Sequence, residues 1–372
     1  MGSRALGGAG SQPALALAGR TYTYGELDAA IEARVRDHPP NTRYDASELS
    51  LADALICVCA AQRSGVGVVV EDPRARPERT DFPPSAFLLV ATSGSTGRPR
   101  PLARTAASWY DSFPVFTTIT GIEPVDTVLI TGPPHATMHL FGALHALWLG
   151  ACVTDDPELA TVVHAVPSVL RGVVERAPKL RVAVVAGIAL DDGARAAAAE
   201  LEVIEYYGSA EVSLVAARRV PEPLRLLDGV RARVRAGLLY VRSPYTVLDA
   251  PEWFGVGDLA ELTEDGELTI RGRGDCAINV GGTTVLAEDV ERVLRTIDGV
   301  TSVGVLGSPH AVLGETVTAA VELDGVSIEQ VRRRARALLA KESMPRRWVV
   351  LSTLPRTATG KVARGELKDL LA

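Results

Sequence analysis

Short apolar runs alternate with amphipathic segments along the first two-thirds of the chain. Apolar runs bounded by turn residues predict buried strands, and apolar residues spaced three and four apart predict helices. The strand candidates are residues 86–91, 126–131, 161–166, 180–186 and 201–207. Helix candidates lie at 168–176 and 192–200, and a capping-box spacing opens another at 23–35. This alternation predicts an α/β fold built on a parallel sheet.

The pattern changes after residue 220. Short strand-like pieces and Gly/Asp turns continue to residue 273 and predict a β-subdomain. An α+β pattern follows, with helices expected at 287–297 and 328–341, strands near 303–306 and 316–323, and a short final helix. We therefore expect a large N-terminal α/β domain with its β-subdomain at 1–272, a hinge at 273–276, and a small mobile C-terminal α+β domain at 277–372.

Composition and charge narrow the class of protein. The chain has 372 residues, enough for two or three domains, and a formal net charge of −6. That charge gives no reason to expect a nucleic acid or an anionic membrane as partner. The apolar runs are too short to cross a membrane, and the first residues lack the apolar core of a secretory signal. Cys57, Cys59, Cys152 and Cys276 have no zinc-ligand spacing, so we expect free thiols in a cytoplasmic protein.

A hydroxyl- and glycine-rich loop follows the strand candidate 86–91. It reads Thr92-Ser93-Gly94-Ser95-Thr96-Gly97. Glycine permits tight turns, so backbone N–H and side-chain O–H groups can converge on an anion such as a nucleotide phosphate. It is not a Walker A loop, because no Gly-Lys-Ser/Thr follows at the required spacing. Taken alone, the loop is equally compatible with an ordinary surface turn.

Two acidic motifs follow strand candidates. In Tyr207-Gly208-Ser209-Ala210-Glu211, the carboxylate stands just past a strand end, where ligands bind in open α/β sheets. One or two carboxylates suffice to hold Mg²⁺ against phosphate oxygens, so Glu211 is a candidate metal ligand. In Phe254-Gly255-Val256-Gly257-Asp258, the carboxylate can accept hydrogen bonds from a ribose diol. Each motif taken singly is also compatible with a surface turn.

Two further motifs lie in the last hundred residues. The first is Gly272-Arg273-Gly274-Asp275, with Asn279 and Gly281-Gly282 just beyond it. Flanking glycines suit a segment that absorbs large dihedral changes. The second is Pro355-Arg356-Thr357-Ala358-Thr359-Gly360-Lys361. The chain has only four lysines, so the lysine in this loop indicates a need for a compact point charge.

In this order, the motifs resemble those of adenylate-forming enzymes, the superfamily of acyl-CoA synthetases, non-ribosomal adenylation domains and luciferases. The resemblance runs from Thr23 to Arg364, with an unusually short N-terminal part. It implies that Lys361 and Thr96 are catalytic and that Asp275 is the pivot of a domain rotation. It also implies an ATP site formed by Thr92, Ser93, Gly94, Ser95, Thr96, Gly97, Tyr207, Gly208, Ser209, Asp258 and Arg273.

The segment His139-Leu140-Phe141-Gly142 resembles the part of the family that borders the acyl pocket. By the same resemblance we expect His139, Gly142, Gly187 and Tyr206 to line that pocket. His135, His139 and His145 lie close together in sequence, but no carboxylate or cysteine lies among them, which disfavours a metal site. No aspartate stands between residues 126 and 155 to hold an amino group, which disfavours an α-amino acid substrate.

The resemblance implies ATP- and Mg²⁺-dependent activation of a carboxylic acid to acyl-AMP with release of pyrophosphate. Transfer to the thiol of CoA, or to the phosphopantetheine of a carrier protein, is then expected. Asn279 replaces the usual hinge lysine and keeps open transfer to another nucleophile, such as an amine. The replacements Arg100, Ala210 and Val256, with the short N-terminal part, keep open a degenerate, non-catalytic binding protein.

Overall fold

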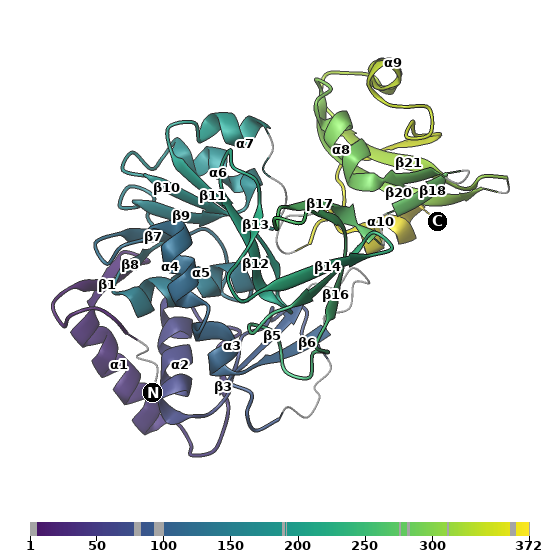
Figure 1. The fold of residues 1–372 in the computed structure, drawn as a ribbon. Coiled ribbons are helices and arrows are strands. Elements are labelled where there is room, and N and C mark those ends of the chain that lie inside the picture. The colour runs from purple at the N-terminus through teal and green to yellow at the C-terminus, as the bar shows by residue number, and fades with distance from the viewer. Residues whose placement is uncertain are drawn as a thin grey trace.

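The computed structural model describes residues 6–77, 83–92, 100–187, 190, 192–274, 277–280, 283–310, 312–357 and 362–371. Its main body carries a mixed sheet covered by helices, and a smaller C-terminal part stands beside it (Figure 1). The helices are α1 Tyr24–Asp37, α2 Leu51–Ser64, α3 Ala106–Tyr110, α4 Phe113–Thr120, α5 Thr137–Leu149, α6 Pro167–Val174, α7 Asp192–Ala197, α8 Ala287–Arg295, α9 Ile328–Leu338 and α10 Arg364–Leu371.

The largest sheet has the order β13-β12-β11-β10-β9-β7-β8-β1-β2. Its strands are β1 Pro13–Leu17, β2 Arg20–Thr23, β7 Thr127–Ile130, β8 Cys152–Thr154, β9 Val162–Ala165, β10 Val182–Val185, β11 Glu202–Ser209, β12 Ser213–Arg219 and β13 Arg225–Leu226. The pairs within β11-β10-β9-β7-β8-β1 are parallel, whereas β12, β13 and β2 run antiparallel at the two edges. The predicted α/β fold with a parallel sheet is confirmed, with antiparallel edges added.

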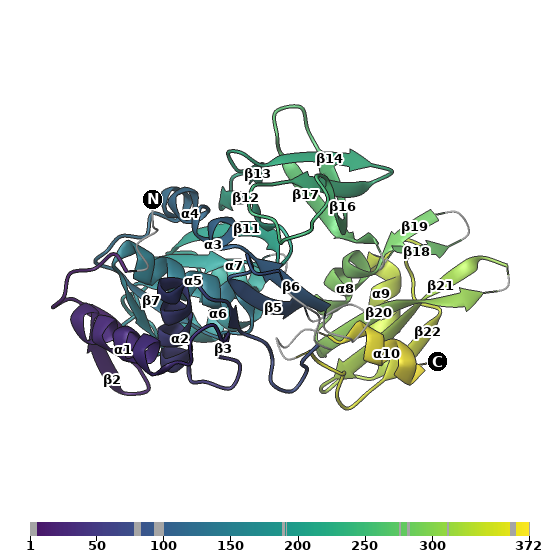
Figure 2. The same cartoon turned by 90° about the horizontal axis from the view of Figure 1, so that it is seen from below.

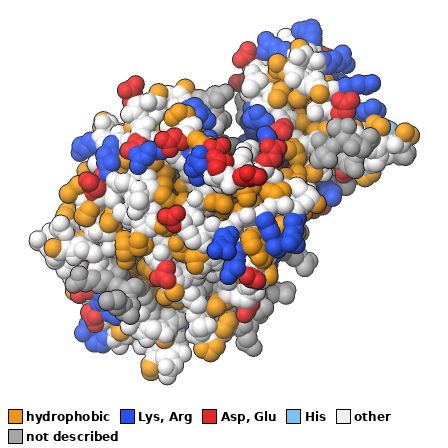
Figure 3. Space-filling view, viewed as in Figure 1, with side chains coloured by type: hydrophobic (Ala, Val, Ile, Leu, Met, Phe, Trp, Pro, Cys, Tyr) orange, Lys and Arg blue, Asp and Glu red, His pale blue; other side chains and the backbone are white. Residues whose placement is uncertain are grey.

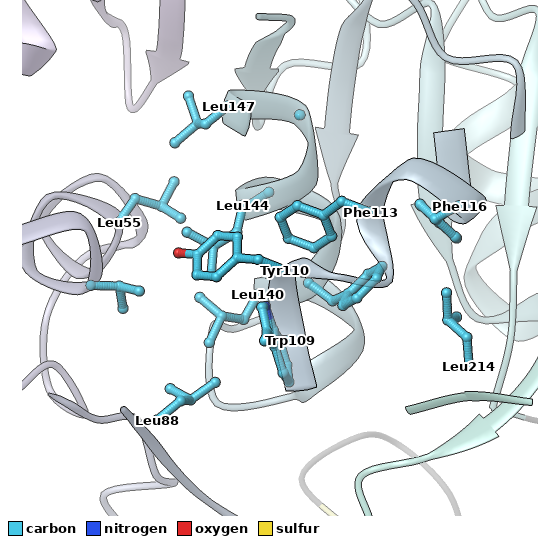
Figure 4. Packing of buried hydrophobic residues seen from close by; sticks show 14 of the residues in the cluster. Leu55, Leu88, Trp109, Tyr110, Phe113, Phe116, Leu140, Leu144, Leu147 and Leu214 are labelled. Atoms are coloured by element: carbon cyan, nitrogen blue, oxygen red, sulfur yellow. The ribbon is translucent and has the colours of Figure 1, made fainter. Parts of the chain in front are cut away.

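Helices cover both faces of this sheet. Alternate strand residues divide between two cores: Val162, Val184 and Ile204 belong to the core on the side of α4 and α5, and Val163 and Ala183 to the core on the side of α6 and α7. The first core is rich in aromatic side chains. Phe113 of α4 lies beside Leu144 of α5, and Phe116 and Leu140 belong to the same core (Figure 4). The sheet is therefore buried on both faces, which explains its continuous apolar strands.

The helix starts follow capping chemistry. Thr23 caps α1 in a reciprocal capping box with Glu26, as its spacing predicted. Ser50 caps α2, whose whole middle is buried. The apolar run around Cys57 and Cys59 is therefore helical, and both thiols are buried and free of disulfides.

A smaller sheet, β3-β4-β5-β6, lies beside the main sheet. It comprises β3 Tyr44–Asp45, β4 Val68–Val69, β5 Leu88–Thr92 and β6 Arg100–Arg104. The strand predicted before the phosphate loop is β5, and β6 returns antiparallel to it. The loop therefore connects two hydrogen-bonded strand ends.

The predicted β-subdomain is an antiparallel sheet in the order β14-β15-β16-β17. Its strands are β14 Arg231–Arg235, β15 Leu238–Arg242, β16 Phe254–Leu262 and β17 Leu268–Arg273. Figure 2 shows it standing between the main sheet and the C-terminal part. The site residues of two motifs, Asp258 and Arg273, therefore lie on neighbouring strands of one sheet.

The C-terminal part has its own sheet and its own apolar core. Its strands are β18 Ala277–Val280, β19 Thr283–Leu286, β20 Val300–His310, β21 Gly314–Leu323 and β22 Arg347–Val350. Buried residues of α8, α9, β20 and β21 form a core separate from those of the main body. The proposed hinge at 273–276 begins at the last residue of β17 and ends just before β18, and its pivot Asp275 lies outside the described residues.

The surface view shows a hollow between the main body and the C-terminal part, with side chains of both charges gathered at that junction (Figure 3). Among the described residues, no helix is both long and apolar enough to span a bilayer.

Candidate active site

The ends of the phosphate loop are fixed by strand pairing. Thr92, the last residue of β5, pairs with Arg100, the first residue of β6. Ser93, Gly94, Ser95, Thr96 and Gly97 lie outside the described residues, and of Thr92 only the backbone is described. The structure therefore locates this predicted loop by its two ends.

The turn that carries Glu211 follows β11. The ladder between β11 and β12 shifts register after Tyr207, and a Cβ at Gly208 would overlap the carbonyl oxygen of Ser213. Only glycine fits this close backbone approach. The Glu211 N–H donates to Ser209 Oγ at 3.3 Å, and the Glu211 carbonyl accepts from Val247 N–H at 2.8 Å. The turn is thus held from both sides, and it aims an acidic residue past the strand end.

Arg100 brings the phosphate loop and the Glu211 turn together. Its Nη2 lies 2.6 Å from Glu211 Oε1. The Glu211 side chain is only 16% exposed, whereas that of Arg100 is 60% exposed. A largely buried carboxylate beside an exposed cation can exchange that cation for another, so the donor chemistry of Glu211 fits a Mg²⁺ shared with phosphate oxygens.

Arg104 is a buried cation that sequence reasoning missed. Its guanidinium donates to the carbonyl oxygens of Ala210 at 2.9 Å, Tyr245 at 2.8 Å and Ser108 at 3.2 Å. Burial lowers the pKa of Arg104 to about 10, opposed by the nearby Glu211 carboxylate. A charged residue near the end of an apolar strand pattern could have indicated Arg104, but its partners Ala210 and Tyr245 are 106 and 141 positions away.

The expected ribose site is assembled from three strands. The Tyr207 hydroxyl of β11 donates to Asp258 Oδ2 on β16. Asp258 is opposite Arg273, the last residue of β17, in the antiparallel ladder. The side chain of Arg273 lies outside the described atoms. The fold thus places three predicted ATP-binding residues side by side, although they are up to 66 positions apart in sequence.

The two ends of the loop that carries Lys361 are paired with each other. Arg356 and Val362 form a β-bridge, and Ala363 N–H donates to the Pro355 carbonyl at 2.8 Å. Lys361 itself lies outside the described residues. Just beyond it, Arg364 is paired with two carboxylates of α8, at 3.1 Å from Glu288 and 2.8 Å from Glu291.

Of the residues expected to line the acyl pocket, those on α5 and Tyr206 lie on the same side of the main sheet. His139 and Gly142 are on α5, and Tyr206 is on β11; Gly187 follows β10 with φ +92°. Burial lowers the pKa of His139 to about 4. Burial also raises the pKa of the Tyr206 phenol. These are neutral groups near pH 7, as an apolar pocket wall requires.

Two further buried rings near these residues were not singled out from the sequence. A Cβ at Gly142 would lie 2.7 Å from the ring of His164, which is on β9. The Phe116 ring centroid lies 5.7 Å from that of His164 and 5.9 Å from that of Tyr206. Only the fold brings His164 to this position, because it lies in an apolar strand pattern far from α5.

The histidine-rich segment has His135 just before α5, and His139 and His145 on it. In the described part of the chain no three His, Cys, Asp or Glu side chains gather closely enough to hold a metal ion. His145 instead shares a hydrogen bond of 2.8 Å with Thr117 Oγ1. His135 Nε2 lies 3.7 Å from Asp72 Oδ2.

Comparisons with known proteins identify the family of this chain. The family model of the AMP-binding enzyme C-terminal domain matches residues 289–361. An uncharacterized acyl–CoA ligase, YhfT, of Bacillus subtilis is 30% identical, over 81% of this chain and 72% of that protein. A probable 2-succinylbenzoate–CoA ligase of Mycobacterium tuberculosis is 30% identical, over 75% of this chain and 83% of its own length.

Solved structures show the same fold. ATP-bound MatB from Rhodopseudomonas palustris superposes with a TM-score of 0.83 at 22% identity, covering 97% of this chain and 96% of that one. The amide bond synthetase McbA from Marinactinospora thermotolerans superposes with a TM-score of 0.80 at 20% identity, covering 97% of each chain. The chain belongs to the AMP-forming acyl–CoA ligases of the adenylate-forming superfamily.

Proposed function

We propose that this chain activates a carboxylic acid with ATP and transfers the acyl group to the thiol of CoA. In the first step a carboxylate oxygen attacks the α-phosphorus, and pyrophosphate leaves. In the second step a thiolate sulfur attacks the acyl carbon, and AMP leaves. The observation that carries the proposal is the similarity to acyl–CoA ligases along 81% of the chain, with the family's motif residues at neighbouring strand ends.

The nucleotide is held by groups from two sheets in this proposal. Asp258 accepts the ribose hydroxyls, supported by the Tyr207 hydroxyl on its Oδ2 and by Arg273 on the next strand. The loop from Thr92 to Gly97 receives the β- and γ-phosphates. Its hydroxyl and amide donors would stabilise the negative charge that develops as pyrophosphate departs.

Glu211 is the residue proposed to hold Mg²⁺. When bound, the ion would neutralise phosphate charge and orient the leaving group. One carboxylate is enough, because Mg²⁺ in nucleotide sites takes most of its ligands from phosphate and water. Arg100 then releases Glu211 and faces the phosphates itself. This is chemically reasonable, since a guanidinium pairs with either group.

Lys361 is proposed to reach the reacting carboxylate and the α-phosphate during the first step. The bridge between Arg356 and Val362, with the Arg364–Glu291 ion pair, holds the base of its loop on the C-terminal part. The second step needs an open path for the thiol, so we propose that the C-terminal part rotates about Asp275 between the steps. The boundaries 1–272, 273–276 and 277–372 describe the moving parts in this proposal.

The proposal is tested by measuring pyrophosphate release with a broad panel of carboxylic acids, followed by hydroxylamine trapping of acyl-AMP. Adding CoA, a phosphopantetheinylated carrier protein or a primary amine then identifies the acceptor by mass spectrometry. Acid-dependent pyrophosphate release with thioester formation on CoA is the expected result. ATP binding without pyrophosphate release for any acid would instead favour a non-catalytic binding protein, and amide formation alone would overturn the thiol acceptor.

A further inference from the structure

One face of the antiparallel sheet β14-β15-β16-β17 is rich in arginine. Two residues of β14, Ala232 and Val234, pack against the core of the main body. Successive strand residues point to opposite faces, so Arg231, Arg233 and Arg235 share the outward face. In the surface view, Lys and Arg side chains gather over β14 and β16 (Figure 3). In a chain of net charge −6, this face is a local concentration of positive charge.

Most of this charge is not neutralised by the protein. Arg231 and Arg235 are exposed, and neither has an ion-pair or hydrogen-bond partner among the described residues. The Nε of Arg233 is buried and also lacks a hydrogen-bond partner there. Arg242, on β15, pairs with Glu252 at 2.8 Å, but both side chains are more than half exposed, so water weakens this pair. The face therefore has guanidinium groups available for an anion.

A groove of about 500 Å³ opens at one end of this face. It is lined by Gly229, Arg231, Arg242, Ser243 and Pro244. Arg231 and Arg242 are directly opposite in the ladder between β14 and β15, so they flank the groove from neighbouring strands. Volumes of roughly 300–1,000 Å³ are typical of small-molecule sites. Two guanidinium groups, each a planar fork of donors, suit the oxygens of a phosphate chain.

Aromatic rings continue the face beside the groove. Arg233 follows Arg231 by two residues on β14. The guanidinium carbon of Arg233 lies 4.0 Å from the ring centroid of Trp253 and 5.8 Å from that of Tyr240. Tyr240 is opposite Arg233 in the ladder, and two residues from Arg242. This group can carry a nucleobase, because bases stack on aromatic rings and on arginine planes.

We propose that this face binds a nucleoside triphosphate at a site separate from the active site. The phosphate chain lies in the groove between Arg231 and Arg242, and the base packs on Arg233 and its aromatic neighbours. On binding, Arg242 exchanges Glu252 for a phosphate oxygen. The inference goes beyond the proposed ligase activity and does not depend on it.

The proposed site is on the opposite side of the sheet from the expected ribose site. Val256 of β16 is buried in the core of the main body. Asp258, two residues further on, faces the same way and accepts from Tyr207. On the outward face, a Cβ at Gly255 would lie 3.2 Å from the Tyr240 ring. The two nucleotides are therefore separated by the sheet, and both can be bound at once.

The base is not restricted to adenine in this proposal. Stacking and cation–π contacts tolerate any base, since every base has a π-face. GTP is therefore a suitable probe, and it is not the nucleotide proposed for the activation step. Inorganic triphosphate carries the phosphate chain without a ring, and guanosine carries the ring without phosphate. Comparing the three probes separates the two parts of the site.

The test separates the two nucleotide sites by substitution. Binding of the three probes is measured by isothermal titration calorimetry in Asp258→Asn, which removes the carboxylate expected at the ribose. GTP should bind saturably, and about tenfold or more tightly than inorganic triphosphate or guanosine. Adding Arg231→Gln should weaken GTP binding about tenfold or more, because a charge-assisted hydrogen bond is lost. The matched control Arg271→Gln removes an exposed arginine of the same sheet that pairs with Glu261, and should leave GTP binding unchanged.

A second measurement covers the case in which Asp258→Asn does not fold. In wild-type protein with excess AMP, which carries the ribose but a single phosphate, GTP should still bind, and Arg231→Gln should weaken it. Arg231→Gln should also leave the KM for ATP in adenylation unchanged, since its groove is outside the active site.

Three results would overturn the inference. The first is GTP binding that disappears both in Asp258→Asn and in wild type with excess AMP, because the active site would then be its only site. The second is equal GTP binding in Arg231→Gln and Arg271→Gln. The third is inorganic triphosphate that binds as tightly as GTP, because the base would then contribute nothing. Each of them leaves the proposed ligase activity intact, whereas absence of pyrophosphate release with every acid overturns that activity alone.

Discussion

The guanidinium of Arg104 holds the carbonyl oxygen of Ala210, the residue directly before Glu211. Arg104 ends β6, the strand that follows the phosphate loop, whereas Ala210 belongs to the turn after β11. One buried side chain therefore ties the loop that is expected to hold phosphate to the turn that is expected to hold the metal. Since Arg100 pairs with Glu211 from the other end of the same strand, β6 positions that turn at two points.

Replacing Arg104 should damage both folding and nucleotide binding. Arg104→Met leaves three buried carbonyl groups without their donor, and we expect a loss of about 3 kcal/mol in the free energy of unfolding, at about 1 kcal/mol or more for each group. Arg104→Lys should recover part of the stability but raise the KM for ATP, because an ammonium cannot span the carbonyls as a guanidinium does. Urea unfolding and adenylation kinetics measure the two effects.

Arg176→Met, which removes an exposed arginine bonded to Gly172, is the control. Equal effects in the two Met variants would contradict a positioning role.

Glu211 and Arg100 should affect the Mg²⁺ requirement in opposite directions. Glu211→Gln removes the charge and should raise the Mg²⁺ concentration needed for half-maximal adenylation severalfold. Arg100→Met removes a cation that competes for the same carboxylate, and should lower it. A magnesium titration of pyrophosphate release at fixed ATP distinguishes them. If both substitutions shift the requirement in the same direction, the pair acts as a structural ion pair and Glu211 is not the metal ligand.

Adenylation should depend on Lys361. Lys361→Ala removes the cation proposed to stabilise charge on the carboxylate and α-phosphate, and the loss of such a group costs roughly 10²–10³ in kcat. Lys368→Ala, on α10, changes the net charge equally and should leave the rate unchanged. Hydroxylamine-trapped acyl-AMP measures the first step alone. Unaltered acyl-AMP formation in Lys361→Ala would remove this lysine from the mechanism.

The sequence predicted the fold class well, because the apolar strands are short, continuous and punctuated by turn residues. The parallel strands β7, β9, β10 and β11 each lie within about two residues of their predicted ranges. Local motifs also indicated the candidate site residues. The structure adds that Tyr207 bonds to Asp258, and that Asp258 is opposite Arg273 in the strand ladder. The sequence did not indicate Arg104, since two of its carbonyl partners, Ala210 and Tyr245, are more than 100 positions away. Such contacts become visible only in the folded chain.

The hinge should allow one half-reaction to be separated from the other. Asp275→Pro fixes φ near −65° at the proposed pivot, so it should leave either adenylation or thioester formation largely intact and impair the other at least tenfold. Both half-reactions are measured separately, the second from preformed acyl-AMP. Glu264→Pro is the control, because it occupies the second position of the turn that Thr263 and Gly266 close, where proline is favoured. Small, equal losses in Asp275→Pro would contradict a rotation about this residue.

Acid should destabilise the main body through its buried histidines. Burial lowers the pKa of His139 to about 4 and the pKa values of His145 and His164 to about 3, whereas an unfolded histidine titrates near 6.5. Above pH 6.5 neither state is protonated. As the pH falls below 6.5, the unfolded chain binds protons that the folded chain does not. Stability is therefore lost progressively down to the folded pKa values, by about 1.4 kcal/mol per pH unit for each histidine.

Three such histidines predict a loss of about 3 kcal/mol between pH 6.5 and 5.5, before most carboxylates titrate. The measurement is the urea midpoint of unfolding at pH 7.5, 6.5 and 5.5, with tryptophan fluorescence as the signal. The double variant His145→Leu, His164→Leu removes two of the three groups, so only about a third of the slope between pH 6.5 and 5.5 should remain. A double variant that keeps the wild-type slope would show that these imidazoles are protonated in the folded protein, contrary to their burial.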